Sequence, residues 1–498
     1  MVVSTSTKLV VIIVFVLYTA ALLVVGWLYK KKLDKQKGEF TDNFYTGGRA
    51  MGALLVAMMV AAGICSAGTF VGSPGKIYSG GLSWAAVVPG QMLMNLMVLG
   101  VIGKKVAIVS RRSKVSSFVG LLFDRYNNNK LLAVISSLVL LVFVGYYTAS
   151  QFIGGGRLFE VMTGIPYWVG LLAFTVVVMV LAAFSGLQGV AAATVIQGCV
   201  MTLACFLLLF LGFGYCGGEQ AFRNLAELNP DLVSGKALYS PLMVLSYFLT
   251  FGFFNPGYPH AVIGCMSYNS TRKMNTAIKI GVVLVAVWSL SLSLLAGTIR
   301  NAFPDLAVSD YALPTLAVAA LPHWVAGLTL AGVVGALQST VGTMVIVMSA
   351  AVVKDLYQSV IKPDASPKTM KSLTTVSTIV ITLVIFVLSL TPPDNLQNVV
   401  IYAVGGMVSA FYIPLMLGLY WMRANEWGAL AGMVGGLATY LLNGMGIVNW
   451  KMGMEPIVIG VIVSLVLTVV VSLLTPKSPY RIIDTWFARN PQYMKDKA

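Results

Sequence analysis

The amino-acid sequence predicts an all-α integral membrane protein with about thirteen transmembrane helices. Hydrophobic residues make up 58% of its 498 positions and charged residues only 10%, whereas a soluble domain has about 25% charged residues. Runs of about 20 apolar residues, the length that a helix needs to cross a bilayer, recur along the whole chain. A transmembrane β-barrel would show short segments of alternating hydrophobicity instead. The composition therefore excludes a water-soluble protein.

The first predicted span covers residues 8–29 and is followed at once by Lys30, Lys31 and Lys32. Because this run lacks the small-residue cleavage site of a signal peptide, we interpret it as a retained helix. The apolar pattern divides the rest of the chain into twelve more segments. These predicted spans are 52–74, 82–103, 131–158, 165–184, 189–216, 238–262, 276–299, 318–349, 372–391, 397–421, 427–446 and 455–475.

The basic residues predict the orientation of these spans. With the N-terminus outside the cell, 26 of the 33 lysines and arginines fall in segments on the inner side. Cytoplasmic loops of membrane proteins carry such an excess. The net charge of +16 is therefore interpreted as a topology signal and not as a nucleic-acid surface. We expect a multi-pass plasma-membrane protein with a cytoplasmic C-terminus, embedded in the lipid bilayer and without an obligate protein partner.

The acidic residues limit the possible coupling chemistry. All 17 lie in loops or near the ends of predicted spans. Proton-driven transporters usually place Asp, Glu or His inside the helical bundle, and His260 alone could take that role here. Five scattered cysteines lack metal-ligand spacing, and no Walker motif or catalytic constellation is present. The sequence thus predicts a protein that is not an enzyme, needs no cofactor, and holds any coupling ion with neutral oxygens.

Two predicted spans are interrupted by glycine and proline. The span 52–74 contains Gly63, Gly68 and Gly72, and the span 238–262 contains the string FFNPGYPH. They head two successive groups of five spans. Interrupted helices at matching positions of two halves point to a transporter binding site, because a broken helix frees backbone carbonyls beside a cavity. The alternative is that both are ordinary kinks, since glycine and proline are common in membrane helices.

The span 318–349 adds hydroxyl groups. Ala336, Ser339 and Thr340 stand at positions i, i+3 and i+4, which share one helix face. Such a face offers two side-chain oxygens beside a small residue that permits close approach. The alternative is that both hydroxyls bond back to a carbonyl one turn earlier in their own helix.

Several motifs, in this order and spacing, give the chain a family likeness. They are NFYTGGRAMG, AGICSAGTFVGSPGKIYSGGLSW, SQFIGGGRLFEVMTGIPY, GYPHAVIGCMSY, LQSTVG and VVKDLY. The chain resembles the sodium:solute symporter family over nearly its whole length, with the nearest pattern in the sodium/pantothenate symporter branch. This resemblance implies a five-plus-five inverted-repeat core with two discontinuous helices. The implied parts are a leading helix 8–29, a first repeat 52–216, a second repeat 238–421, two extra helices within 427–475 and a cytoplasmic tail 476–498.

The resemblance also implies a sodium site between the first interrupted span and the span 318–349. Backbone carbonyls would come from Ala62, Cys65 and Ala336, and hydroxyls from Ser339 and Thr340. The implied substrate contacts are Ser66, Thr69, Gln91, Tyr147, Gln151, Asn255, Tyr258 and His260. For the two glutamines the alternative is a hydrogen bond to a neighbouring helix, for the tyrosines packing or gating, and for the histidine a structural role.

Two further residues bear on coupling and substrate. Thr194 stands where relatives often place an aspartate, which favours one sodium over two. Arg157 is the arginine nearest to the predicted pocket and is expected to pair with Glu160, three positions later. The expected function is sodium-coupled secondary active import of a small organic solute, a carboxylate such as pantothenate, by alternating access. The alternatives are a proton-coupled or sodium-independent permease of the same fold, and a non-transporting sensor.

Overall fold

The computed structural model describes residues 5–234, 239–393, 395–450 and 453–488. Within these ranges the chain forms helices and loops and no strand. Nine helical segments of the described residues are long and apolar enough to cross a membrane, or ten if one bent pair is counted as a span. The predicted all-helical, multi-pass architecture is therefore confirmed. The count of thirteen stays a prediction, because several predicted spans share one continuous helical segment.

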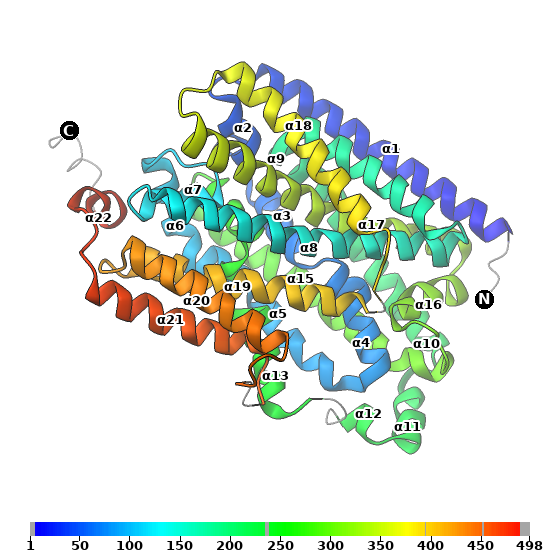
Figure 1. Ribbon diagram of the computed structural model, residues 1–498. Helices are drawn as coiled ribbons and strands as arrows, with labels where there is room; N and C mark the ends of the chain where they lie inside the picture. The colour runs from blue at the N-terminus through cyan, green and yellow to red at the C-terminus, as the bar shows by residue number, and fades with distance from the viewer. Residues whose placement is uncertain (1–4, 235–238, 394, 451–452, 489–498) are drawn as a thin grey trace.

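The leading helix is longer than its apolar run. Helix α1 (Thr5–Lys35) continues through the lysines that follow the predicted span 8–29, because long basic side chains can extend from a helix end to the polar membrane surface. It packs against α9 and α17 along the outside of the bundle (Figure 1). The short helices α2 (Phe40–Thr46) and η1 (Gly47–Arg49) turn the chain by 100° into α3 (Ala53–Ile64).

The first interruption lies inside the predicted span 52–74. Helix α3 stops at Ile64 because Cys65 is extended, with φ −76° and ψ 93°. Helical structure resumes in η2 (Gly68–Gly72) and α4 (Ser73–Gly80), and Gly81, with φ +73°, ends it. The chain returns through η3 (Gly81–Val87), α5 (Val88–Asn95), η4 (Leu96–Gly103) and α6 (Lys104–Arg112), followed by α7 (Phe118–Arg125).

Two predicted spans lie in one helical segment. After α8 (Lys130–Thr163), helix α9 (Tyr167–Leu207) runs on through η5 (Leu208–Gly212) and α10 (Phe213–Tyr215). Its Gly186 has the non-helical values φ 62° and ψ −175°, which a residue with a side chain rarely adopts. This glycine falls between the predicted spans 165–184 and 189–216, so the predicted boundary coincides with a kink. Two short helices follow, α11 (Gly218–Leu228) and α12 (Asp231–Ser234).

The second interruption lies in the predicted span 238–262, whose first residue is outside the described residues. Helices α13 (Pro241–Phe248) and η6 (Leu249–Phe253) stop before the one-turn η7 (Asn255–Gly257), and α14 (Pro259–Met266) starts anew. Pro256 and Pro259 each lack the backbone N–H that would continue a helix. Both interruptions that the sequence predicts are thus present in the fold.

The remaining helices complete the bundle. The predicted span 318–349 begins later than expected, because α16 (Ala312–Ala320) is a separate helix and α17 (His323–Ala350) starts after Pro322; α17 continues as η9 (Ala351–Ile361). The others are α15 (Thr271–Ala302), η8 (Ser309–Tyr311), α18 (Pro367–Leu388), α19 (Leu396–Tyr420), α20 (Glu426–Gly444), α21 (Pro456–Leu474) and α22 (Tyr480–Phe487). The predicted tail thus contains a helix, and its residues 489–498 lie outside the described ranges.

Helix α17 is the buried centre of this arrangement. It packs against α9, α1, α8 and α3, and its most apolar 18-residue stretch is fully buried. Figure 1 shows α10, α11, α12 and α16 gathered toward the end of the bundle near the N-terminus, and α2, α6, α7 and α22 at the opposite end.

Candidate functional site

Both hydroxyls of α17 meet the first interruption. Ser339 Oγ donates to the carbonyl of Ala336 at 2.8 Å and contacts the carbonyl of Ala62 at 3.4 Å. Thr340 Oγ1 lies 2.8 Å from the carbonyl oxygen of Ala62 and 3.1 Å from that of Ala336. The sequence left two roles open for these hydroxyls, a contact with the first interruption and a hydrogen bond back to their own helix. Both occur, since the hydroxyls bond the Ala336 carbonyl in α17 and also reach the Ala62 carbonyl in α3. Four of the five predicted sodium ligands therefore lie within contact of one another.

The break in α3 makes one of these carbonyls available. Because the helix ends at Ile64, the Ala62 carbonyl lacks the fourth-residue N–H donor that a continuing helix would provide. Cys65 occupies the break itself, and its buried thiol lies beside Thr69 and Ser289. Its carbonyl, the fifth predicted ligand, stays a prediction. Backbone carbonyls of an unwound helix and hydroxyl oxygens are ligands that suit an alkali cation.

No carboxylate belongs to this cluster. Ala62, Ala336 and Thr340 are completely buried, and Ser339 is 2% exposed. Among the described residues, no group of three or more His, Cys, Asp and Glu side chains could hold a metal ion. Thr194 donates its hydroxyl to the Val190 carbonyl of its own helix at 2.9 Å. The cluster therefore suits a single monovalent cation better than a divalent one.

Gln151 supports the first interruption from α8. Its Oε1 accepts a hydrogen bond from the Ala67 N–H at 2.7 Å, and its Nε2 donates to Ser150 Oγ at 3.0 Å and to the Tyr147 carbonyl at 3.3 Å. Its amide is thus engaged by the protein on both ends. Gln151 therefore bonds a neighbouring helical segment, which is the alternative to a substrate contact. Through this bond to Ala67 it positions the break.

We expect Gln151→Leu to destabilise the protein by about 1–3 kcal/mol, because the buried Ala67 N–H would lose its acceptor. Thermal unfolding in detergent measures this loss. Gln220→Leu is the matched control, since the Gln220 amide is exposed and bonds only Asn224. Equal unfolding temperatures for Gln151→Leu and the control would contradict a role for Gln151 in holding the break.

The second interruption carries a histidine between two tyrosines. The His260 ring centroid lies 5.5 Å from that of Tyr147 and 5.8 Å from that of Tyr258. Tyr147 in turn shares a hydrogen bond of 3.0 Å with Ser66 Oγ, on the first interruption. Four predicted substrate residues therefore form one contiguous group, the histidine group: Ser66, Tyr147, Tyr258 and His260. Ser66 and Tyr258 come from the non-helical turns of the two interruptions. Tyr258 donates its own hydroxyl to the Thr250 carbonyl at 3.0 Å.

Polar atoms of this group lack partners. Both imidazole nitrogens of His260 and Oδ1 of Asn255 have no hydrogen-bond partner among the described residues, although both side chains are at least 98% buried. Asn255 Nδ2 is engaged by the Gly252 carbonyl at 2.8 Å. Buried polar groups are normally paired, and such a set beside broken helices indicates a place for water or for a polar ligand. These atoms are the ones that a solute could reach.

Two predicted substrate residues stand apart. Thr69 lies beside the Cys65 thiol, and the described structure gives its side chain no hydrogen bond with the histidine group. Gln91 is buried on α5, next to Gly90, where α5 approaches η6 so closely that a Cβ on Gly90 would lie 2.7 Å from the Phe248 carbonyl oxygen. The described structure gives Gln91 no hydrogen bond with the interruptions. Their role as substrate contacts stays a prediction.

The sequence analysis missed Gln397, at the start of α19. Its Oε1 is buried without a partner in the described residues. A Cβ on Gly72 would lie 2.4 Å from this oxygen, and one on Gly68 would lie 3.1 Å from it. The two glycines, four residues apart in η2, therefore form a groove for this amide just after the first interruption. Two features of the sequence could have indicated this contact: a glutamine in the first turn of the predicted span 397–421, and a Gly-x-x-x-Gly pattern in the first interrupted span.

The prediction that Arg157 pairs with Glu160 is wrong. Arg157 forms an ion pair with Asp310 and also donates to the Pro393 carbonyl, while Glu160 accepts from the Tyr311 hydroxyl at 3.1 Å. Asp310 Oδ2 also accepts the Leu396 N–H at 3.0 Å. The pair thus connects α8, η8 and the start of α19. The i, i+3 spacing favoured Glu160 as the partner of Arg157, but the fold places the Asp310 carboxylate next to the Arg157 guanidinium.

The profile of the sodium:solute symporter family matches residues 44–436, which is most of the chain. The chain belongs to the sodium:solute symporter family. The sodium/pantothenate symporter of Haemophilus influenzae is 34% identical over 87% of this chain and 91% of its own length. That of Escherichia coli is 33% identical over 86% of this chain and 90% of its own.

A solved structure shares the fold of this symporter. A Na+-coupled sialic acid symporter, in a substrate-bound outward-open state, matches with a TM-score of 0.79 over 94% of this chain and 98% of that one, at 19% identity. At that identity the likeness concerns the fold alone. Family membership, sodium-coupled relatives and the helical bundle together establish a multi-pass membrane protein that carries out sodium-coupled symport of a small solute.

Proposed function

We propose that this symporter imports pantothenate or a closely similar small carboxylate, driven by one sodium ion. The observation that supports this proposal most directly is a set of buried polar atoms without a partner in the described residues. They are His260 Nδ1, His260 Nε2 and Asn255 Oδ1, and Ser66 and Tyr147 belong to the same region. Pantothenate offers a carboxylate, an amide and hydroxyls that could pair with such neutral donors and acceptors. The two relatives named above are sodium/pantothenate symporters at 33–34% identity, which supports this substrate over others.

The sodium and solute positions share one structural element. Ala62 and Ser66 flank the same break, with Ala62 in contact with Thr340 and Ser66 in contact with Tyr147. A sodium ion held by the Ala62 carbonyl would order the break and thereby fix Ser66 for the solute. Each ligand would then favour the same conformation, and this coupling is reciprocal. We propose that a four-helix bundle, formed by the predicted spans 52–74, 82–103, 238–262 and 276–299, rocks against the other helices and exposes this region to either side in turn.

The proposed orientation places the end with α6, α7 and α22 in the cytoplasm of a plasma-membrane protein. Its support is the excess of basic residues in the segments at that end, such as Lys104, Lys105 and Arg112. The inward sodium gradient would then drive uptake of the solute. The relatives are transporters, and we propose transport without any catalysed reaction or bound cofactor as the whole activity.

The test is uptake of labelled pantothenate into proteoliposomes. An imposed inward sodium gradient is expected to drive accumulation, and a choline gradient of equal size is not. Unlabelled pantothenate should compete with the label, while proline and sialic acid should not. Accumulation that is equally fast without sodium would overturn sodium coupling, and competition by proline alone would overturn the proposed substrate.

His260→Gln is expected to raise the half-saturating concentration of the solute about 10-fold, because it removes one buried hydrogen-bonding ring from the solute position. The sodium dependence of uptake should stay unchanged, since His260 is not among the sodium ligands. Uptake measured against solute concentration at two sodium concentrations checks both. If His260→Gln instead abolished a pH-driven uptake that persists without sodium, the proton-coupled alternative would be supported. Thr329→Val is the matched control, a buried substitution on α17.

A further inference from the structure

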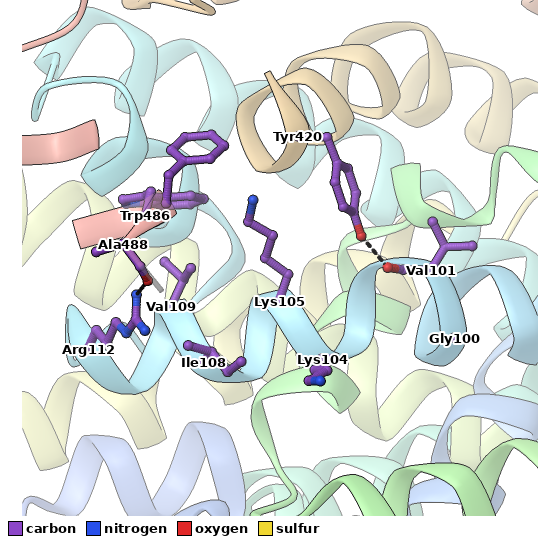
Figure 2. A pocket seen from close by; sticks show the side chains of 11 residues that line it. Gly100, Val101, Lys104, Lys105, Ile108, Val109, Arg112, Tyr420, Trp486 and Ala488 are labelled. Carbon is purple, nitrogen blue, oxygen red and sulfur yellow. Dashed lines mark hydrogen bonds between the residues drawn. The ribbon is translucent and has the colours of Figure 1, made fainter. Parts of the chain in front are cut away.

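A second site lies at the end of the bundle where α6 meets α22. It is a pocket of about 420 Å³ formed by η4, α6, the end of α19 and α22. Figure 2 shows Lys105 rising from its helix between Tyr420 and Trp486, and Arg112 reaching Ala488. The solute position between the interruptions includes none of these residues. The pocket is therefore separate from the solute position.

The pocket is strongly basic. Lys104, Lys105 and Arg112 line it, and none of the three forms an ion pair with a carboxylate in the described ranges. Arg112 donates to the carbonyls of Thr485 at 3.1 Å and Ala488 at 3.0 Å, which leaves its charge unneutralised. Three cations around one cavity, without a compensating acid, favour an anionic ligand.

Aromatic rings hold two cations at this pocket through cation–π contacts. Lys105 Nζ lies 4.1 Å from the Phe487 ring centroid and 5.2 Å from that of Tyr420. Behind these rings, Arg125 lies 5.5 Å from the Phe487 ring and is held by backbone carbonyls. The Asp124 carboxylate accepts hydrogen bonds from Trp486 Nε1 at 2.8 Å and Ser113 Oγ at 2.6 Å. Asp124 thus bonds one lining residue, but it is not itself among the residues that line the pocket.

The floor of the pocket continues as an apolar membrane face. Gly100, Lys104 and Ile108 follow one another at intervals of four residues, and all three are exposed, as is Leu96 before them. They belong to the segment Gly68–Arg112, which is apolar enough to span the bilayer. The exposed stripe is therefore apolar at Leu96 and Gly100, and it becomes basic from Lys104 to Arg112, with Ile108 between these two cations. Tyr420 stands half-exposed at the mouth, as tyrosines do at membrane surfaces.

We propose that this pocket binds the phosphate headgroup of an anionic phospholipid from the surrounding bilayer. The headgroup would lie among Lys104, Lys105 and Arg112, and an acyl chain would follow the exposed face of Gly100 and Leu96. A free phosphate would use the cations only, whereas the ligand that matches both the cations and the apolar stripe is an amphiphile. Basic pockets beside membrane helices recognise lipid headgroups on this physical ground. A bound lipid would tie α6 to α22 and to the end of α19.

The experiment is native mass spectrometry of the purified full chain in detergent, titrated with phosphatidylglycerol or phosphatidylcholine. Phosphatidylglycerol is expected to bind at least about 10-fold more tightly. Lys104→Gln/Lys105→Gln should remove this preference, and Lys104→Arg/Lys105→Arg should keep it. Arg112 is left unchanged because it holds α22. The matched control Lys362→Gln/Lys368→Gln removes two exposed charges elsewhere and should bind like the parent protein.

Several outcomes would overturn the proposal. Equal binding of phosphatidylcholine, or an equal loss in the control variant, would show that the bound lipid does not depend on this pocket. Displacement of the lipid by inorganic phosphate at a similar concentration would assign the pocket to a free anion instead. If the double glutamine variant cannot be recovered folded, Lys104→Gln and Lys105→Gln are tested singly, since Lys104 is exposed and Lys105 is partly exposed. An unchanged lipid preference in both single variants would also contradict the proposal.

Discussion

Replacing both Ser339 and Thr340 by alanine is expected to abolish sodium-stimulated uptake. The double variant removes both hydroxyl oxygens from the cluster that they form with the carbonyls of Ala62 and Ala336. An interaction with a charged partner contributes about 1.5–3 kcal/mol, so losing two should weaken sodium binding on the order of 100-fold or more. The measurement is the sodium activation curve of solute uptake in proteoliposomes.

The control for this double variant must lose two buried hydroxyl groups at a place away from the proposed sodium site. Thr378 and Thr382 on α18 are also buried, and each donates to a carbonyl one turn earlier in its own helix, at 2.7 and 2.8 Å. Thr378→Ala/Thr382→Ala should therefore reproduce any general cost of losing buried hydroxyls while leaving sodium activation unchanged. An unaltered sodium curve in the Ser339/Thr340 variant, or an equal shift in the control, would contradict the sodium site.

Breaking the ion pair between Arg157 and Asp310 is expected to destabilise the protein by about 3–5 kcal/mol, because one charge is left buried without a partner. Asp310 is 1% exposed and also anchors the Leu396 N–H. In Arg157→Gln its carboxylate would remain in place with no arginine beside it. Thermal unfolding of the detergent-solubilised protein measures the loss, and uptake assays show whether the connection between α8, η8 and α19 is needed for transport.

The loss in Arg157→Gln should depend on pH. Burial raises the pKa of the Asp310 carboxyl, and Arg157 is the largest influence that opposes this rise. Without the arginine the pKa rises further, so the folded state takes up a proton more readily than the unfolded chain. The variant should therefore regain stability as the pH falls and lose it as the pH rises.

Two companion variants make this prediction specific. Arg157→Gln/Asp310→Asn removes both charges and should recover part of the stability, as a double-mutant cycle would reveal. Arg223→Gln breaks the pair with Glu219, whose side chains are 67% and 82% exposed, and should change stability by less than about 1 kcal/mol. A pH-independent loss, or one as small as that of Arg223→Gln, would refute the buried-charge explanation.

Local patterns in the sequence determined the helical bundle and its two interruptions. Apolar runs place helices such as α8 and α21 within a few residues of the predicted spans, because the bilayer demands that each backbone polar group is paired within its own segment. Glycine and proline mark the breaks at Cys65 and at Asn255–Gly257. The i, i+3, i+4 spacing placed Ser339 and Thr340 on one face, and that face meets Ala62.

Sequence patterns do not define where one crossing ends when helices continue through it. The segments Gly68–Arg112 and Tyr167–Tyr215 each include two predicted spans or parts of them. Glycines at positive φ, Gly81 and Gly186, mark the changes of direction within them. A lone glycine in an apolar run is too common in membrane helices to reveal such a turn by itself. The sequence consequently identifies the apolar segments, but it does not determine how many times the chain crosses the membrane.

The tertiary structure alone decided which polar side chains meet. Gln151 bonds the Ala67 N–H, 84 positions away, and therefore supports the break, whereas His260 stays unpaired between Tyr147 and Tyr258. Arg157 pairs with a residue 153 positions distant and not with its helical neighbour Glu160. Residue types and spacing can identify such groups as candidates, because burial in an apolar segment makes a polar side chain costly. Which partner satisfies each of them depends on how distant helices pack, and only the folded bundle determines that.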